Sequence, residues 1–462
     1  MFNNKIRNIN KEINKNLFTY FRYAITTMIS ILIFRSSAII DTIFTGHYIS
    51  ATGLAAMGLI LPIDTFCLAI IQSLTSGSIV VMGGYLGERN FGKANALFTK
   101  SSITLFAIMS FLSLIILLFT ENLIMFLGGN EILLADCTTY LRVYALFLIF
   151  KAFEHFLSAC VRLTGRTTIP PIFSFINTII NFALKYIFVI KLGLGIAGIA
   201  YSTAIALLIV SFMYLICILT DKEKRLGFTL ILGSFKEIFY IAYNGISSFA
   251  ILVSVSIFAI IANKIIIQHL TIDGLSAVAP INMMMYINYS FISVFMTSMV
   301  PLVSINYGRK YFHNVKLFLK YTINGGLIFS SILFILSATI PTKIVDIFLD
   351  KNIGANITDI ALYGLNIVKY QFILILFAMI LNEFLTSIQR PLESLLLSLL
   401  TALISPISSI LILSKLFGTF GIFLSFPVAS FISSSVSGYV FYSNRIKYLS
   451  NQDMRNRKFY KY

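Results

Sequence analysis

The sequence predicts an all-α polytopic membrane protein with twelve transmembrane helices in two six-helix bundles. Two features of its composition support this class: 58% of the 462 residues are hydrophobic and only 11% are charged, whereas a soluble domain carries about 25% charged residues. The third observation is that apolar stretches recur from end to end, each long enough to cross a bilayer of about 30 Å as a helix. The alternating runs of about ten residues that are typical of a membrane barrel do not occur.

The apolar stretches define the expected helices in chain order. Several are longer than a bilayer requires, so we expect these helices to tilt or to extend beyond the membrane. The expected ranges are 17–45, 53–83, 96–119, 133–160, 169–190, 195–219, 238–267, 276–303, 315–345, 357–389, 392–414 and 420–444.

The distribution of basic residues predicts how the chain is oriented. When the loops are assigned alternately to two sides, one side receives both termini and most of the 35 lysines and arginines, and the opposite side is acidic. Because basic loops stay in the cytoplasm, we expect both termini there and the protein in the plasma (inner) membrane. The net charge of +17 then reflects topology and attraction to anionic lipid rather than binding of nucleic acid.

The longest charged connection lies at the midpoint of the chain and predicts two lobes. A weak repeat supports them, because with a shift of 221 residues Gly87 aligns with Gly308 and Phe91 with Phe312. Six helices per lobe make the repeats parallel and related by pseudo-two-fold symmetry, as in alternating-access carriers. The expected parts are a cytoplasmic N-terminal segment 1–16, a first lobe 17–219, a cytoplasmic inter-lobe loop 220–237, a second lobe 238–444 and a basic cytoplasmic tail 445–462.

Four short motifs in chain order resemble those of one transporter family. They are DTIFTGH at 41–47, RLTGRTTIP at 162–170, GIAYST at 198–203 and PLVSINYG at 301–308. Together they extend over much of the chain, which resembles the bacterial type of the MATE (multidrug and toxic compound extrusion) family. The resemblance implies two six-helix bundles in a V, and export of organic cations or other amphiphiles driven by inward flow of H⁺ or Na⁺.

The leading functional prediction is therefore a secondary active antiporter that works by alternating access, and not an enzyme. The alternative is a flippase of the wider superfamily that moves a lipid-linked saccharide or peptidoglycan precursor. Twelve spans and the NYG exit of the eighth helix favour the antiporter, whereas a cationic cavity would favour the flippase. We expect a small-molecule substrate, the lipid bilayer as surroundings, a monomeric carrier, no nucleic-acid partner, no metal site and no cofactor beyond the transported ion.

The resemblance also implies a cation-coupling site in the first lobe. In many bacterial relatives this site uses an Asp on the first helix, an Asn and an Asp four residues apart on the fifth, and a Thr on the sixth. Asp41, Asn181 and Thr203 match this set, but Lys185 stands where the fifth-helix Asp would be. Exchanging a carboxylate for an ammonium changes the charge of the site by two units and makes a poor Na⁺ site, so H⁺ is the favoured coupling ion.

Three interpretations of Lys185 are open. By helical rise, Lys185 lies about 9 Å and Asp41 about 7.5 Å from the outer ends of their helices. At this similar depth the two charges would form an ion pair that protonation of Asp41 breaks. In the second interpretation Lys185 snorkels to the headgroups, and in the third the cation site is degenerate and inactive. Direct binding of an anionic substrate by Lys185 is a minor variant.

Further charged side chains lie inside expected spans and are candidates for substrate or proton handling. Glu383 on the tenth helix has no basic residue close to it in the sequence, and desolvation favours a neutral carboxyl, which suits proton uptake. On the fourth helix, Glu154 and His155 lie one turn from Lys151. A structural role is the alternative for each candidate, and Asp64 on the second helix is expected to be structural.

Overall fold

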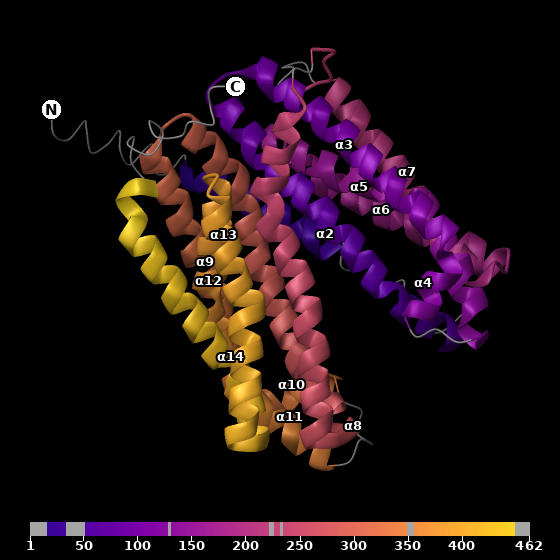
Figure 1. Ribbon diagram of the computed structural model, residues 1–462, viewed down its shortest axis with the longest axis vertical. Helices are drawn as coiled ribbons and strands as arrows, with labels where there is room; N and C mark the ends of the chain where they lie inside the picture. Colours follow the sequence, from indigo (N-terminus) through magenta and orange to yellow (C-terminus); the bar gives the residue numbers. More distant parts are fainter. Residues whose placement is uncertain are drawn as a thin grey trace. The chain divides into compact units, whose positions relative to one another are not determined.

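The structure is a computed structural model, which describes residues 16–33, 51–127, 131–220, 226–231, 234–348 and 355–448 (Figure 1). All regular secondary structure in these ranges is helical. The chain divides into two compact units. We call Arg22–Gly245 the N-unit, and Met1–Phe21 together with Ile246–Tyr462 the C-unit.

The N-unit is built around one central helix, α5, which packs along α2, α3 and α7. The next helix, α6, packs mainly on α7, and this contact positions the candidate site described below (Figure 1). The bounds are α2 Ala51–Gly87, α3 Phe91–Leu118, α4 Thr120–Phe126, α5 Glu131–Leu163, α6 Ile169–Lys185, the π-helical turn η1 Tyr186–Lys191 and α7 Gly195–Leu219.

The C-unit has α12 at its centre, in contact with α9, α13 and α14. Its apolar core includes Ile281, Phe372 and Phe423, all fully buried. The bounds are α8 Lys236–Gly308, α9 Phe312–Thr339, α10 Pro341–Phe348, α11 Ala355–Val368, α12 Gln371–Ser387, α13 Pro391–Leu399, the π-helical turn η2 Leu400–Ile404 and α14 Ser405–Tyr448. The first turns of α8 belong to the N-unit.

The helices confirm the all-α polytopic class. Within the described residues, nine helices are long and apolar enough to cross a membrane, or ten if the bent pair Ile357–Val368 and Gln371–Ser387 is one span. One of the nine, Pro391–Asn444, contains both of the last two predicted spans. It is kinked at Gly418, whose φ of 55° and ψ of −130° suit glycine. The helix at 16–33 is the described part of the predicted first span.

The border between the units differs from that of the predicted lobes, 17–219 and 238–444. The connecting segment is attached to α3 of the N-unit: the Gly227 N–H donates to Asn95 Oδ1 at 3.0 Å. The Lys100 ammonium, whose side chain is 2% exposed, donates to the Ser234 carbonyl at 3.0 Å. Because these bonds fix the segment to the N-unit, the chain passes to the C-unit only after Gly245.

Candidate transport site

Helix α6 carries its polar residues on the buried face. Asn177, Asn181 and Lys185 follow one another at intervals of four and are all buried, because residues four apart share a helix face. Phe175 and Ile179 on the opposite side are exposed. A helix that buries its polar face and exposes its apolar face suits a lipid environment, and it directs these three side chains into the N-unit.

A chain of hydrogen bonds joins three of the four residues predicted for the cation-coupling site. The Lys185 ammonium donates to Asn181 Oδ1, and Asn181 Nδ2 donates to Thr203 Oγ1 on α7 at 3.2 Å. Lys185 is 0% exposed, so its ammonium does not extend to the headgroups as the snorkelling interpretation requires. Asp41 lies outside the described residues, and its ion pair with Lys185 stays a prediction.

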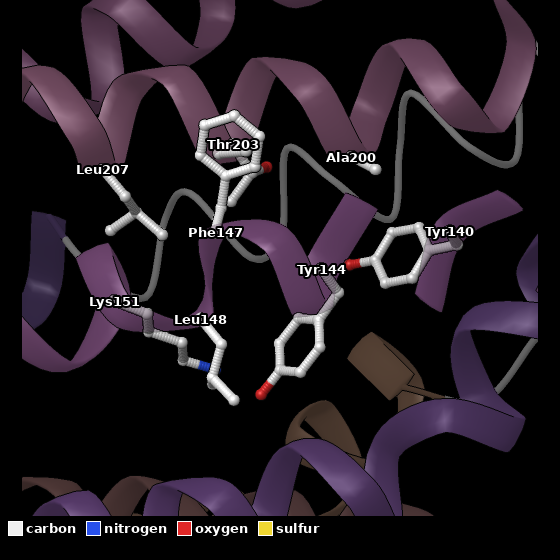
Figure 2. Close-up of a pocket in the computed structure, with 9 residues that line it drawn as sticks. Tyr140, Tyr144, Phe147, Leu148, Lys151, Ala200, Thr203 and Leu207 are labelled. Atoms are coloured by element: carbon white, nitrogen blue, oxygen red, sulfur yellow. The ribbon is translucent and has the colours of Figure 1, made fainter. Parts of the chain in front are cut away.

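A pocket lies beside Thr203 in the N-unit, between α5 and α7 (Figure 2). The empty space within it amounts to about 320 Å³, open space at the mouth included. Lys151 is the one charged side chain among the nine that line it. The lining residues are Tyr140, Tyr144, Phe147, Leu148, Lys151, Ala200, Thr203, Ala204 and Leu207. Thr203 therefore connects the Lys185 hydrogen-bond chain to the wall of this pocket.

The Lys151 ammonium forms an ion pair with Asp64 on α2. It also lies 5.3 Å from the centroid of the Tyr144 ring, within the range of a cation–π contact. Helical spacing had placed Glu154 beside Lys151, but the ion pair runs across helices instead. This pair could not be predicted from the sequence, because the faces on which α2 and α5 meet do not follow from residue spacing. The available signal was that both charges lie inside apolar spans, where a charge requires a partner.

The other two candidates on α5 lie outside the pocket lining. His155 Nε2 is 2.7 Å from Gln72 Oε1 on α2, and the imidazole donates this hydrogen bond when Oε1 is the acceptor. Glu154 is half-buried on the same helix, and the described part of the chain shows no ion pair for it. The structure thus brings His155 and Glu154 into the N-unit without joining them to the Lys185 chain.

Glu383 lies on α12 in the C-unit, apart in the chain from the other candidates. Its side chain is half-buried, and the residue before it belongs to a buried neutral network. Asn382 Nδ2 donates to Ser398 Oγ at 2.6 Å, and Ser394 Oγ donates to Asn382 Oδ1 at 2.6 Å. Thr386 shares a 2.6 Å hydrogen bond with the same Ser394 hydroxyl. Next to Glu383, polar groups therefore satisfy one another without charge.

In the described ranges, no three His, Cys, Asp or Glu side chains are grouped so that they could hold a metal ion. Around Thr203 and the pocket, the described residues bring together the ammonium groups of Lys185 and Lys151, the Asp64 carboxylate, the Asn181 amide and the Thr203 hydroxyl. Such groups bind and exchange charged species, and buried charges of this kind mark ion and substrate pathways in membrane proteins.

The fold and the buried charges define a multi-pass helical membrane protein of the transporter class. The MatE family model matches residues 27–187 and 246–411. Since these two segments make up more than half of the chain, the protein belongs to the MATE family of transporters. A curated relative, the probable multidrug resistance protein YoeA of Bacillus subtilis (strain 168), is 25% identical over 189 residues. That match covers 40% of this chain and 40% of the relative.

Solved structures share the fold over nearly the whole chain. An outward-facing multidrug resistance MATE family transporter of the MOP superfamily has a TM-score of 0.86 at 18% identity, covering 94% of this chain and 96% of that one. A MOP superfamily transporter from Pyrococcus furiosus has a TM-score of 0.87 at 17% identity, with the same coverage. A variant of the Vibrio cholerae transporter VcmN has a TM-score of 0.87 at 16% identity, covering 95% of this chain and 98% of that one. At these identities the likeness shows the fold alone.

Proposed function

We propose that the protein is a secondary antiporter that exports amphiphilic organic compounds, organic cations among them, by alternating access. We further propose that inward flow of H⁺ drives the export. Family membership and the name of the Bacillus subtilis relative, a probable multidrug resistance protein, support the transport of drugs. The single observation that carries the choice of ion is the buried Lys185 ammonium bonded to Asn181.

The preference for H⁺ follows from the charge and the ligands around Lys185. Two like unit charges 4 Å apart repel by about 4 kcal/mol at an effective dielectric constant of 20, so an ammonium opposes a second cation in the same site. Asn181 Oδ1, an oxygen that could coordinate Na⁺, accepts a hydrogen bond from Lys185 instead. A proton needs no cage of oxygen ligands, and a carboxylate such as Asp41 can take it up and release it.

Export of a fluorescent organic cation from proteoliposomes tests this choice of ion. Inward gradients of H⁺ and Na⁺ are imposed separately on wild type and on Lys185→Asp. We expect wild type to respond to H⁺ alone, and the variant to gain a response to Na⁺. Lys191→Asp is the matched control, because this lysine lies six residues along the chain but is exposed over the Tyr186 ring. A wild type that requires Na⁺, or two variants that behave alike, would contradict the proposal.

A flippase of the wider superfamily is the second candidate function. The observation in its favour is again Lys185, because a cationic site suits the phosphate of a lipid-linked precursor. The Pyrococcus furiosus neighbour is described as having a binding pocket of reversed polarity that suggests a different function. Here the exchange of a family carboxylate for a lysine also reverses a charge. Absence of cation export, together with transfer of a lipid-linked phosphate between leaflets, would favour the flippase.

We propose a monomeric carrier in the plasma membrane with both termini in the cytoplasm. The basic loops on one side of the chain support this orientation. The variant Ser443→Cys in a background without the four native cysteines tests it, since Ser443 lies near the end of α14. We expect a membrane-impermeant maleimide to label this cysteine only after permeabilisation of the cells. Labelling of intact cells would place the end of α14 outside.

A further inference from the structure

The ion pair between Lys151 and Asp64 places its ammonium group on the wall of the N-unit pocket. We propose that Lys151 binds the acidic group of an aromatic amphiphile, and that Asp64 takes the place of this group when the pocket is empty. The inference rests on the proposed function in taking this pocket as a substrate site. It adds aromatic acids to the substrate classes of the carrier.

The Lys151 ammonium is accessible to a ligand. Lys151 lines the pocket, and the side chains of Lys151 and Asp64 are 23% and 33% exposed. Ion pairs that keep this much exposure are weak, because water and other ions compete for both partners. The anionic group of a ligand can therefore compete with Asp64 for Lys151. By comparison, the Lys185 ammonium is 0% exposed and does not line the pocket.

A second polar group, the Tyr144 hydroxyl, lies beside this ammonium. It is buried, and its polar neighbours are the Asp64 carboxylate and the Cys67 thiol. Figure 2 shows the Tyr144 hydroxyl and the Lys151 ammonium directed toward the same side of the pocket. Buried hydroxyls in proteins nearly always find a partner. A carboxylate has two oxygens, one for each of these donors.

The remaining wall of the pocket fits an aromatic body. The rings of Tyr140, Tyr144 and Phe147 form one part of the lining, and Leu148 and Leu207 form another. Helix α7 contributes two small side chains to the lining, Ala200 and Ala204. Rings stack favourably on aromatic side chains. The lining therefore selects a ring system with one acidic group.

The charges near the pocket allow this exchange of partners. Asp64 is the partner that the structure gives Lys151 among the described carboxylates. Glu154 and His155 lie farther along α5 and do not line the pocket, and His155 is already bonded to Gln72. Removing the charge of Asp64 should therefore free Lys151 to bind the ligand. Removing the charge of Lys151 should leave the acidic group of the ligand without a partner.

Binding of three probes that share one ring system tests the inference. The probes are 1-naphthoate, the cation 1-naphthylmethylammonium and the neutral 1-naphthalenemethanol, each measured by equilibrium dialysis against the full chain in nanodiscs. For 1-naphthoate we expect Asp64→Asn to raise the affinity about tenfold and Lys151→Met to lower it about tenfold, since one charged hydrogen bond corresponds to about a factor of ten. The cation should bind more weakly to Asp64→Asn, and the neutral probe should change less than about twofold.

Two further variants control the measurement. Lys191→Met removes an exposed lysine outside the pocket and should leave all three affinities unchanged. Tyr144→Phe removes only the hydroxyl and should weaken 1-naphthoate alone, by about threefold. If one of Asp64→Asn and Lys151→Met folds poorly, the direction of the change in the other, together with that in Tyr144→Phe, still decides the test. Equal or same-direction effects of the two variants on 1-naphthoate would overturn the inference.

The test is independent of the proposed function. If the naphthoate pattern is found but no proteoliposome export of organic cations occurs, the pocket assignment stands and the antiport proposal is wrong. If cation export is driven by H⁺ but the affinity for 1-naphthoate does not change when the charge at position 64 or 151 is removed, the antiport proposal stands and this inference is wrong.

Discussion

The two units satisfy the polar groups of their helices in different ways. In the N-unit the groups are charged: the buried Lys185 ammonium donates to Asn181, and the partly exposed Lys151 pairs with Asp64. In the C-unit the bonds around Asn382 join amides and hydroxyls without charge. Inside a bilayer a charged group responds strongly to an arriving ion, whereas a satisfied neutral network stays as it is. From this comparison we expect the N-unit, rather than the network around Asn382, to respond to the coupling ion that we propose.

Two glycines at helix contacts, one in each unit, differ in what an added side chain would meet. A Cβ added at Gly245 of α8 would lie 1.8 Å from the Ser73 carbonyl oxygen of α2, which is a backbone atom. In the C-unit, a Cβ at Gly326 of α9 would lie 2.5 Å from a terminal methyl group of Leu376, which can move. At Gly245 the contact thus fixes the distance between two helix backbones, whereas at Gly326 a side chain can move to make room.

The largest effect we expect is on the stability of the N-unit. Gly245→Ala forces α8 away from α2, and should lower the free energy of unfolding by about 3 kcal/mol, the upper end for overpacking. Gly326→Ala should cost about 1 kcal/mol because a side chain can yield. Thermal unfolding in detergent measures both. Gly438→Ala is the control, since nothing lies within 4 Å of an added Cβ there. Equal losses for the Gly245 and Gly326 variants would remove this difference between the units.

The next effect compares an amide bonded to a charge with an amide bonded to hydroxyls. Asn181→Leu removes an acceptor of a buried ammonium, and should cost about 2–3 kcal/mol and slow H⁺-driven export. Asn382→Leu leaves the hydroxyls of Ser394 and Ser398, which can donate to backbone carbonyls instead. We therefore expect it to lower the free energy of unfolding by only about 1 kcal/mol. Thermal unfolding and proteoliposome export are measured on both variants. Export that falls equally in the two variants would contradict the assignment of ion coupling to the N-unit.

Much of the fold could be predicted from the sequence, because length and hydropathy decide which segments span a bilayer. The predicted span 357–389 is the instructive exception: α11 and α12 within it are bent by 49°, a consequence of packing that hydropathy does not record. The border between the two units at Gly245 could not be predicted either, because it depends on hydrogen bonds of the connecting segment.

Residues of the candidate site could be predicted only where they lie in a motif that resembles the family. Asn181, Lys185 and Thr203 were named from a family resemblance, and the structure joins them. The ion pair between Lys151 and Asp64 depends on which faces of α2 and α5 meet, and no local spacing encodes that contact. Residue spacing places Glu154 beside Lys151 on the same helix. Spacing shows only such local neighbours, and not a partner on another helix.

The smallest effect we expect concerns a neutral hydrogen bond in the C-unit. Ser330 Oγ donates to Asn288 Oδ1 at 2.9 Å, and both side chains are buried. Ser330→Ala removes this donor, and should cost about 0.6 kcal/mol, the average for hydrogen bonds between helices in a membrane. Because no charge is involved, the dependence of export on the H⁺ gradient should stay as in wild type.

The matched control for this variant is Ser408→Ala, whose exposed hydroxyl bonds only within its own helix turn among the described contacts. Thermal unfolding should separate the two serine variants slightly, and export assays should not separate them at all. If Ser330→Ala instead uncouples export from the H⁺ gradient while Ser408→Ala does not, the neutral network of the C-unit takes part in coupling. The assignment of ion coupling to the N-unit alone would then be wrong. The Ser330 hydroxyl and its Asn288 partner would be taking part in the coupling that we assign to Lys185 and its partners.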